Sequence, residues 1–321
     1  MSRVRVFTAA DVARAVNPRA AVDAVARAFV AHAEGTWTMP PKVYVTNYPA
    51  GDFRAMPALG GGHALLKWVT SFPGNPARGL PTVTGVVVLS DAETGELEAL
   101  FDAAAVTALR TGAAAVLAAE ALARPDAESV AVIGAGVNGQ AVARTFLARG
   151  RAVGLWDIDT ARAQQAAAAI GAAVVPSREE ALASDIVVTV TPGREPLFDN
   201  GSLRPGQHVS LMGADGPGKA EIASDELARA RTSVQPRMRI FCDDWEQASH
   251  SGDIAHAVAG GKIGRFDVTQ LGAVLAGTAA GRQAAEDITV FDSTGLAIQD
   301  LAIAIACFEQ IGDLEVAEIE L

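Results

Sequence analysis

The chain has 321 residues, and its 26 lysine and arginine residues against 37 aspartate and glutamate residues give a net charge of −11 at pH 7. Half of the residues are hydrophobic, which excludes intrinsic disorder, and the length suits two domains of ordinary size. Nucleic-acid-binding proteins normally carry a basic face, because phosphate contacts supply most of their affinity. The acidic balance therefore argues against nucleic acid and anionic membranes as partners and favours a small molecule.

The two cysteines, Cys242 and Cys307, are too few for a disulfide framework, and no cysteine or histidine spacing matches a zinc site. The amino terminus lacks the apolar core of a signal peptide. Apolar stretches such as residues 113–119 and 301–308 are too short to span a bilayer. We therefore expect a soluble cytoplasmic protein that holds no metal.

The first third of the chain is expected to form a helix, an antiparallel sheet and a second helix. Asn17 and Pro18 cap a helix over residues 19–33, whose apolar residues recur at helical intervals. Extended segments separated by turn residues are expected at residues 42–46, 53–57, 64–70, 82–90 and 97–101. An alanine-rich helix over residues 103–123 closes this part.

From residue 129 the pattern changes to short, continuously apolar strands that alternate with helices. These strands are expected at residues 130–133, 153–156, 173–175, 186–190, 208–212, 240–243 and 288–291. Such strands form a parallel sheet that is buried on both faces. An apolar helix over residues 296–311 is expected to return to the first part. The sequence thus predicts an α/β protein with a doubly wound parallel (Rossmann) sheet over residues 125–295 and a second, α+β domain over residues 1–124 plus 296–321.

Gly134, Gly136 and Gly139 form a GxGxxG motif between a predicted strand and a predicted helix. The first glycine permits the tight turn, the second lets a pyrophosphate approach the backbone, and the third lets helix and strand pack closely. Asp157 ends the next strand, where a carboxylate accepts hydrogen bonds from ribose hydroxyls and repels a 2′-phosphate unless Arg162 neutralises it. The motif predicts a dinucleotide, NAD rather than NADP. A merely solvated Asp157 would remove that preference and leave the fold intact.

Polar residues follow two further strands of the predicted sheet. Thr191 follows the strand at residues 186–190, where a doubly wound sheet lines its cofactor crevice, and is either a nicotinamide contact or an ordinary strand-end threonine. Gly213-Ala-Asp215 follows the strand at residues 208–212. Glycines beside an aspartate can deliver its carboxylate into the same crevice, although a plain turn has the same composition.

Three basic residues, Arg54, Lys67 and Arg110, interrupt apolar segments in the first part. A lysine inside an apolar strand must find a partner, lose its proton, or reach solvent from an edge strand. If Lys67 is buried beside other cations, its pKa falls toward neutrality and it becomes a workable general acid or base. A buried Arg110 requires a carboxylate or a phosphate, and a structural ion pair would serve as well as a ligand.

These segments together resemble the ornithine cyclodeaminase/μ-crystallin family over nearly the whole chain, and most closely its archaeal-type alanine dehydrogenases. The matching segments are Met39-Pro-Pro-Lys-Val-Tyr44, Arg54-Ala-Met-Pro57, Lys67-Trp-Val, Pro73-Gly-Asn-Pro76, Gly79-Leu-Pro-Thr-Val83, Thr107-Ala-Leu-Arg-Thr-Gly112, Gly134-Ala-Gly136, Ala214-Asp-Gly-Pro-Gly-Lys219 and Phe291-Asp-Ser-Thr-Gly-Leu-Ala-Ile-Gln-Asp300. The resemblance implies an NAD cofactor, hydride chemistry at the Cα–N bond of an amino acid, and a homodimer joined through the first domain, which would also bind the substrate.

The resemblance also implies roles for individual residues. Lys67 and Asp215 match the family's catalytic residues, and the sequence does not assign which of the two acts as the acid and which as the base. Residues expected at the substrate are Lys42, Arg54, Lys67 and Thr294. Residues expected at the cofactor are Thr82, Arg110, Gly134, Gly136, Val137, Asn138, Gly139, Asp157, Thr191, Met212, Gly213, Lys219 and Ser293.

One departure from the family pattern bears on the substrate. Where this chain has Arg54, the ornithine enzymes carry a glutamate that can hold the distal ammonium of the substrate. A guanidinium repels a second amine and attracts a carboxylate, which favours an NAD-dependent L-amino-acid dehydrogenase of the alanine type. The alternatives are cyclodeamination of ornithine to proline with recycled NAD, reduction of a preformed imine such as a cyclic ketimine or iminosuccinate, and a non-enzymatic binding protein. The presence of Lys67 and Asp215 argues against the last.

Overall fold

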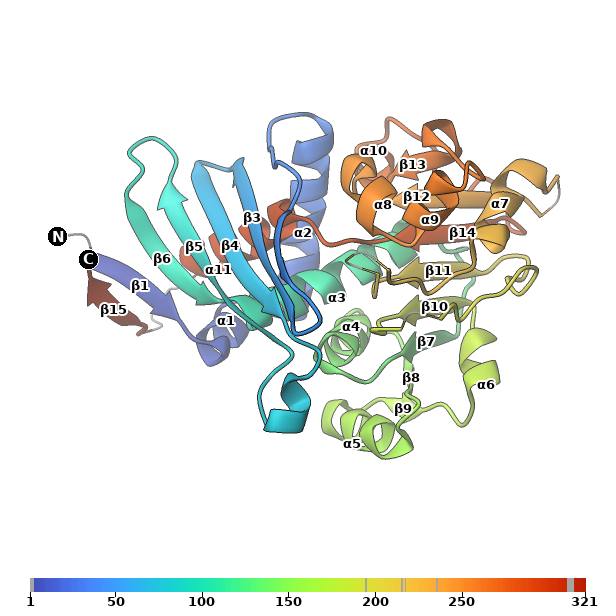
Figure 1. The fold of residues 1–321 in the computed structure, drawn as a ribbon, viewed down its shortest axis with the longest axis horizontal. Helices are drawn as coiled ribbons and strands as arrows, with labels where there is room; N and C mark the ends of the chain where they lie inside the picture. Colours follow the sequence, from blue (N-terminus) through green and yellow to red (C-terminus); the bar gives the residue numbers. More distant parts are fainter. Residues whose placement is uncertain (1–2, 194, 215, 217, 235, 311–314) are drawn as a thin grey trace. The chain divides into compact units, whose positions relative to one another are not determined.

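A computed structural model describes residues 3–193, 195–214, 216, 218–234, 236–310 and 315–321 of the chain. The chain forms two compact units: unit 1 comprises Met1–Arg110 with Leu296–Leu321, and unit 2 comprises Thr111–Gly295 (Figure 1). The sequence placed the first boundary after residue 124, whereas the two units divide within helix α3 (Ala103–Leu122). Asp215, a predicted catalytic residue, lies outside the described residues.

Among the described residues, unit 1 contains a seven-stranded sheet in the order β15-β1-β6-β5-β4-β3-β2. Its strands are β1 (Arg3–Phe7), β2 (Val43–Asn47), β3 (Gly51–Gly60), β4 (His63–Ser71), β5 (Val83–Asp91), β6 (Leu97–Asp102) and β15 (Ala317–Glu320). Neighbouring strands are antiparallel except for the parallel pair β1 and β6. The remaining elements are α1 (Ala9–Ala15), α2 (Pro18–Ala33), η1 (Asn75–Arg78) and α11 (Ala297–Glu309).

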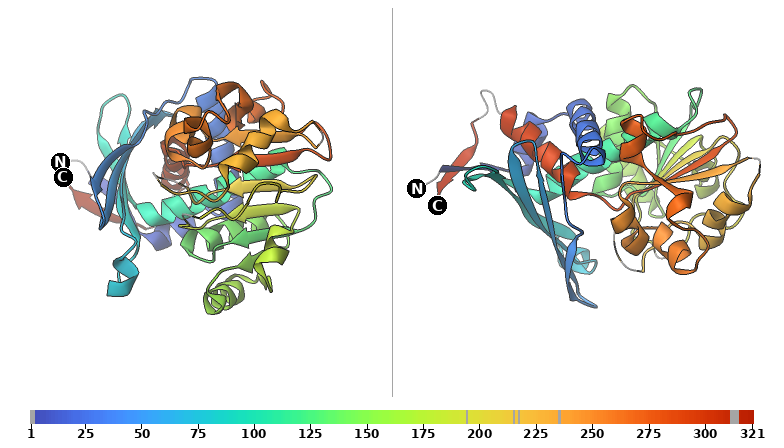
Figure 2. Two further views of the ribbon diagram at one scale, coloured as in Figure 1. Left: turned by 45° about the vertical axis from the view of Figure 1, so that its right-hand side comes forward. Right: turned by 90° about the horizontal axis from the view of Figure 1, so that it is seen from above.

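Helices α2 and α11 lie on one face of this sheet, and α11 packs against α2, β3 and β4 (Figure 2). Strand β4 shows the resulting alternation: Leu65, Lys67 and Val69 are buried, whereas Leu66 and Trp68 are 42% and 39% exposed. Successive side chains of a strand point to opposite faces, so Lys67 belongs to the face that carries the helices. A charged residue has thus been placed in the core of unit 1.

Unit 2 contains an eight-stranded sheet among its described residues, in the order β13-β12-β14-β11-β10-β7-β8-β9, and all of its strand pairs are parallel. The strands are β7 (Val130–Ile133), β8 (Gly154–Trp156), β9 (Ala173–Val174), β10 (Ile186–Thr189), β11 (His208–Leu211), β12 (Met238–Cys242), β13 (Val268–Gln270) and β14 (Ile288–Asp292). The helices are α4 (Val137–Ala148), α5 (Thr160–Ile170), α6 (Arg178–Leu182), α7 (Ser224–Thr232), α8 (Trp245–Ser251), α9 (Ile254–Ala259), η2 (Arg265–Asp267) and α10 (Leu271–Leu275). The predicted fold class is confirmed, although β1, β13 and β15 were not anticipated.

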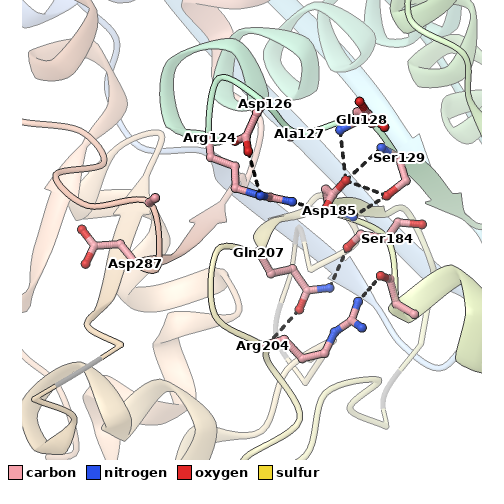
Figure 3. Close-up of polar contacts among 12 residues, drawn as sticks. Arg124, Asp126, Ala127, Glu128, Ser129, Ser184, Asp185, Arg204, Gln207 and Asp287 are labelled. Atoms are coloured by element: carbon pink, nitrogen blue, oxygen red, sulfur yellow. Dashed lines mark hydrogen bonds and ion pairs between the residues drawn. The ribbon is translucent and has the colours of Figure 1, made fainter.

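A carboxylate network ties the starts of β7 and β10 together (Figure 3). Asp185 accepts hydrogen bonds from the backbone N–H groups of Glu128 and Ser129, both at 3.0 Å, from the Ser129 hydroxyl at 2.9 Å, and from Nη2 of Arg124 at 2.6 Å. Burial alone would raise the pKa of Asp185, but these donors lower it well below its ordinary value. This network lies at the amino ends of the strands, so it stabilises the edge opposite the carboxyl ends, where such sheets bind ligands.

Helix α3 is long and apolar enough to cross a membrane by length and composition alone. Two thirds of its most apolar window is nevertheless buried inside the protein, at 67%. A core helix of a globular protein passes the same test, so the length of α3 does not alter the interpretation of the fold.

Candidate active site

The glycine motif of unit 2 joins β7 to α4, and its three glycines lie in different steric surroundings. Gly134 has φ +107, and a Cβ there would lie 2.5 Å from the carbonyl oxygen of Val190. A Cβ on Gly139 would lie 1.7 Å from the carbonyl oxygen of Gly134, so strand and helix pack too closely for a side chain. A Cβ on Gly136 would meet no atom within 4 Å. The middle glycine therefore borders open space that a ligand can occupy.

The amino terminus of α4 fits a pyrophosphate. Gly136 is its N-cap residue, and no side chain in the described part of the chain caps the helix. The free N–H groups of a helix start and its positive dipole end attract phosphate oxygens. Val137 is 69% exposed and Asn138 is half-buried, so the first turn of α4 stays accessible.

Asp157 lies directly after β8 and is only 8% exposed. Its Oδ2 accepts from the backbone N–H of Ala135 at 2.8 Å, and its Oδ1 accepts from the N–H of Asp159 at 2.9 Å. Nη1 of Arg162 lies 3.5 Å from Oδ1. The next residue, Ile158, is 88% exposed and was not among the predicted site residues. An exposed isoleucine therefore stands next to a buried carboxylate at the carboxyl end of β8.

Glu221, which the sequence analysis missed, joins the loops that follow β10 and β11. Its carboxylate accepts from the hydroxyls of Thr189 and Thr191, both at 2.7 Å, and from the N–H groups of Thr191 at 2.9 Å and Gly213 at 2.8 Å. Glu221 is fully buried, and burial raises its pKa. The predicted cofactor residues Thr191 and Gly213 are thus held together by one buried side chain. Met212 is also buried.

The loop after β14 is held by a second buried carboxylate, Asp243. Its Oδ2 accepts from the backbone N–H groups of Thr294 at 2.7 Å and Gly295 at 2.8 Å, and from the Ser293 hydroxyl at 3.2 Å. The Thr294 hydroxyl donates to the same carboxylate and accepts from Gln247. The structure places both hydroxyls against Asp243, and the predicted contacts of Ser293 with the cofactor and of Thr294 with the substrate stay predictions.

Unit 1 carries a compact group of charged residues around Lys67. Lys67 is 1% exposed, and its amine donates to the Thr107 hydroxyl at 2.6 Å and to Oδ1 of Asp300 at 2.9 Å. Nε of Arg110 lies 3.7 Å from the same Asp300 oxygen. Burial lowers the pKa of Lys67 to about 8, with Arg110 and Arg54 acting in the same direction and Asp300 opposing them. An amine with this pKa exchanges protons readily near neutral pH.

Arg54 lies on the same face of the sheet, on β3. Its Nε donates to Oδ1 of Asp52 at 2.6 Å, and its guanidinium stands 5.4 Å from the centre of the Tyr44 ring. Asp52 in turn accepts from the Tyr48 hydroxyl at 3.3 Å. Arg54 is therefore a buried, oriented cation with a carboxylate partner, not an isolated one.

The remaining predicted residues fall on less buried positions. Lys42, immediately before β2, and Thr82, immediately before β5, are half-buried. Lys219 is half-buried in unit 2. In the described part of the chain, no group of three or more histidine, cysteine, aspartate and glutamate side chains could hold a metal ion.

Sequence reasoning missed Asp300 and Asp52, although each left a signal. Asp300 is the only charged residue of the apolar segment 297–308, and such a carboxylate requires a cation just as Lys67 requires an anion. Asp52 precedes Arg54 by two residues, which places both on one face of a strand. Pairing each isolated charge with another of opposite sign would have found both residues.

The chain is similar to known proteins along nearly its whole length. A profile of the ornithine cyclodeaminase/mu-crystallin family matches residues 3–315. The alanine dehydrogenase of Archaeoglobus fulgidus is 41% identical over 314 residues, which cover 95% of this chain and 94% of that protein. The family resemblance inferred from the sequence is confirmed.

Two solved structures extend this similarity to the fold. An archaeal alanine dehydrogenase dimer with bound NAD is 39% identical, with a TM-score of 0.91 and full coverage of both chains. The iminosuccinate reductase of Paracoccus denitrificans in complex with NAD+ is 29% identical, with a TM-score of 0.87 and full coverage of both chains. The chain is thus similar along its whole length to nicotinamide-dependent enzymes that act on amino acids or imines.

Proposed function

Because the chain belongs to the ornithine cyclodeaminase/mu-crystallin family, we propose that it is an NAD-dependent L-amino-acid dehydrogenase of the alanine type. The reaction converts an L-amino acid, NAD+ and water into a 2-oxo acid, ammonium, NADH and a proton. The observation that carries the proposal is the buried Lys67 amine with a pKa of about 8, in a group that contains two guanidinium groups. Such a group suits a substrate that has a carboxylate and undergoes proton transfers.

The residues of unit 2 fit an NAD molecule. Gly136 and the first turn of α4 would hold the pyrophosphate, Asp157 the adenosine ribose, and Ile158 the adenine. Thr191 would lie on the nicotinamide side, on the loop that Glu221 holds. When bound, the nicotinamide supplies the acceptor for the hydride that leaves the substrate Cα.

Lys67 supplies the proton transfers that accompany loss of the hydride. The substrate ammonium must lose a proton before the Cα–H bond breaks, and the water that attacks the resulting iminium must lose another. Ammonia then leaves the carbinolamine once its nitrogen is protonated. A lysine with a pKa of about 8 can accept and return these protons in turn. Arg54, oriented by Asp52, would bind the carboxylate and repel the second amine of a diamine such as ornithine.

The decisive test is a set of initial rates with NADH, ammonia and a panel of 2-oxo acids. We expect NADH oxidation that depends on ammonia, and net NADH formation with alanine in the reverse direction. Release of ammonia from ornithine without net NADH would support a cyclodeaminase, and reduction that needs no added ammonia would support an imine reductase. Lys67→Met should retain NADH binding and lose a factor of about 10²–10⁴ in turnover. Unchanged turnover would remove Lys67 from the mechanism.

We further propose that the protein is a homodimer joined through the bare face of the unit 1 sheet. The register puts Val43 opposite Ala55 and Ala55 opposite Trp68, so these side chains share one face. Val43 and Val45 are 56% and 52% exposed, and Leu66 and Trp68 also remain exposed. An apolar patch of this kind on a sheet face marks a protein interface. Both cysteines are free and buried, which agrees with a reducing, cytoplasmic setting.

A further inference from the structure

The Lys67 amine contacts two oxygen atoms that can only accept a hydrogen from it. The Thr107 hydroxyl has one hydrogen, which it donates to the carbonyl oxygen of Ala103 at 2.6 Å, so at 2.6 Å from Lys67 it acts as an acceptor. Asp300 presents a carboxylate oxygen at 2.9 Å. Both contacts therefore require an N–H bond of Lys67.

These two contacts leave one position on the nitrogen. A neutral amine has two hydrogens and a lone pair, and an ammonium has three hydrogens. Because two hydrogens are committed in either state, only the third position changes on titration, from a lone pair to an N–H bond. Lys67 can therefore gain or lose a proton without breaking either hydrogen bond.

We propose that Asp300 is a positioning residue which, together with Thr107, fixes the single site on Lys67 where a proton is exchanged with the substrate. This inference rests on the proposed function, in which Lys67 carries the protons. Three elements that are far apart in the sequence supply the parts: Lys67 comes from β4, Thr107 from α3 and Asp300 from α11.

The hydrogen-bonding pattern around Asp300 assigns its effect to Lys67. Arg110 approaches Asp300 only to 3.7 Å, which is too long for a hydrogen bond, and its buried Nε has no hydrogen-bond partner among the described residues. The second oxygen of Asp300 also has none among them. Among the residues that the structure describes, Lys67 is thus the side chain that donates a hydrogen bond to the Asp300 carboxylate.

The charges that face Lys67 determine what loss of Asp300 would do. Arg110 on α3 and Arg54 on β3 favour the neutral amine, as burial does, and Asp300 on α11 favours the ammonium. The cross-strand neighbours of Lys67, Met56 and Val87, are apolar. Replacement of Asp300 by asparagine removes the negative charge that contacts the Lys67 amine and should lower the pKa of Lys67.

The chain has only four lysines, Lys42, Lys67, Lys219 and Lys262, which makes a direct measurement practicable. Lysine labelled with ¹³C at Cε would give four signals, and Lys67→Met would identify that of Lys67. In the Asp300→Asn variant we expect the titration midpoint of the Lys67 signal to fall by about 1–3 pH units. Amino-acid oxidation requires neutral Lys67, so the rising limb of kcat against pH should move to lower pH by the same amount, with a lower plateau.

Controls separate positioning from a general loss of structure. Asp11→Asn removes another buried carboxylate of unit 1, one that caps α1, and should leave the Lys67 midpoint and the pH profile unchanged. Thr107→Val removes the second acceptor and should lower kcat, whereas Thr107→Ser keeps the hydroxyl and should restore it. If Asp300→Asn does not fold, the threonine pair decides: kcat with valine equal to that with serine overturns the inference.

The two proposals fail in different ways. If the wild-type protein oxidises no amino acid but Asp300→Asn still shifts the Lys67 midpoint, the proposed function is wrong and the positioning of Lys67 stands. If the enzyme is active and Asp300→Asn moves neither the midpoint nor the limb of the pH profile, Asp300 has only a structural role and the inference is overturned.

Discussion

Replacement of Asp185 by asparagine should destabilise unit 2 at neutral pH and much less in acid. Oδ2 of Asp185 accepts three hydrogen bonds and Oδ1 accepts one from Arg124 (Figure 3). Asparagine can keep its oxygen toward the three donors, but its NH₂ group then faces the Arg124 guanidinium. The variant loses one charge-assisted hydrogen bond and weakens three others.

The cost follows from the strength of hydrogen bonds to charged groups, about 1.5–3 kcal/mol each. The Asp185 side chain is 25% exposed, so solvent screens part of the loss. We expect Asp185→Asn to lower the free energy of unfolding at pH 7 by about 2–3 kcal/mol. At about 2–4 °C per kcal/mol for a unit of this size, Tm should fall by roughly 4–12 °C.

The dependence on pH has a definite sign. The folded-state pKa of Asp185 is lowered, so its stabilisation is fully present above the unfolded-state pKa of about 3.9 and is lost as pH falls toward the folded-state pKa. The difference between wild type and Asp185→Asn should therefore shrink below pH 4, by up to about 1.4 kcal/mol per pH unit. This difference in stability can be measured by urea titrations at pH 7, 4 and 3, in which the fluorescence of Trp156 and Trp245 reports the unfolding of unit 2.

Asp126 provides the matched control, because it pairs with the same arginine at 3.1 Å but is 74% exposed. Exposed ion pairs contribute little, so Asp126→Asn should change stability by less than about 1 kcal/mol at every pH. The reasoning is refuted if Asp185→Asn is as stable as wild type at pH 7, or if the difference between them stays constant down to pH 3.

Four further variants have definite expected outcomes. Gly136→Ala should leave Tm unchanged, because the added Cβ enters open space, and should weaken NADH binding at least about tenfold in a fluorescence titration. Gly139→Ala should lower Tm, because the added Cβ meets the carbonyl oxygen of Gly134. Asp157→Ser should reduce the ratio of kcat/KM for NAD to that for NADP by roughly 10–100-fold; an unchanged ratio would show that the carboxylate does not select the cofactor. Trp68→Lys should yield monomers by light scattering, and a persistent dimer would place the interface elsewhere.

The nucleotide-binding unit could be predicted because its signals are local. Continuous apolar segments mark buried parallel strands, and three glycines at fixed spacing require a tight turn and a close helix. The strand expected at residues 130–133 has the same bounds as β7, and the strand expected at residues 186–190 is one residue longer than β10. Each of these patterns is set by steric rules within a few residues, so no long-range contact is needed to recognise it.

Unit 1 was harder because its decisive contacts join distant parts of the chain. β1 pairs with β15 near the other terminus, and both strands are short, so neither has a pattern that stands alone. Lys67 and Asp300 are 233 residues apart. The sequence marked Lys67 as an anomaly in an apolar strand, but which carboxylate meets it depends on the return of α11 to the sheet.

The net charge of −11 is a poor guide to the site, because a sum over the chain does not depend on how the charges are arranged. In unit 1, Arg54, Lys67 and Arg110 stand against Asp52 and Asp300, so these five groups carry one net positive charge when Lys67 is protonated and none when it is neutral. A monocarboxylate substrate balances the protonated state, and release of one proton from Lys67 changes that balance by a full charge in a buried setting. Binding of a 2-oxo acid, whose carboxylate is its only charge, should therefore raise the pKa of Lys67 and supply the proton that the reductive direction requires, whereas amino-acid oxidation requires the neutral amine.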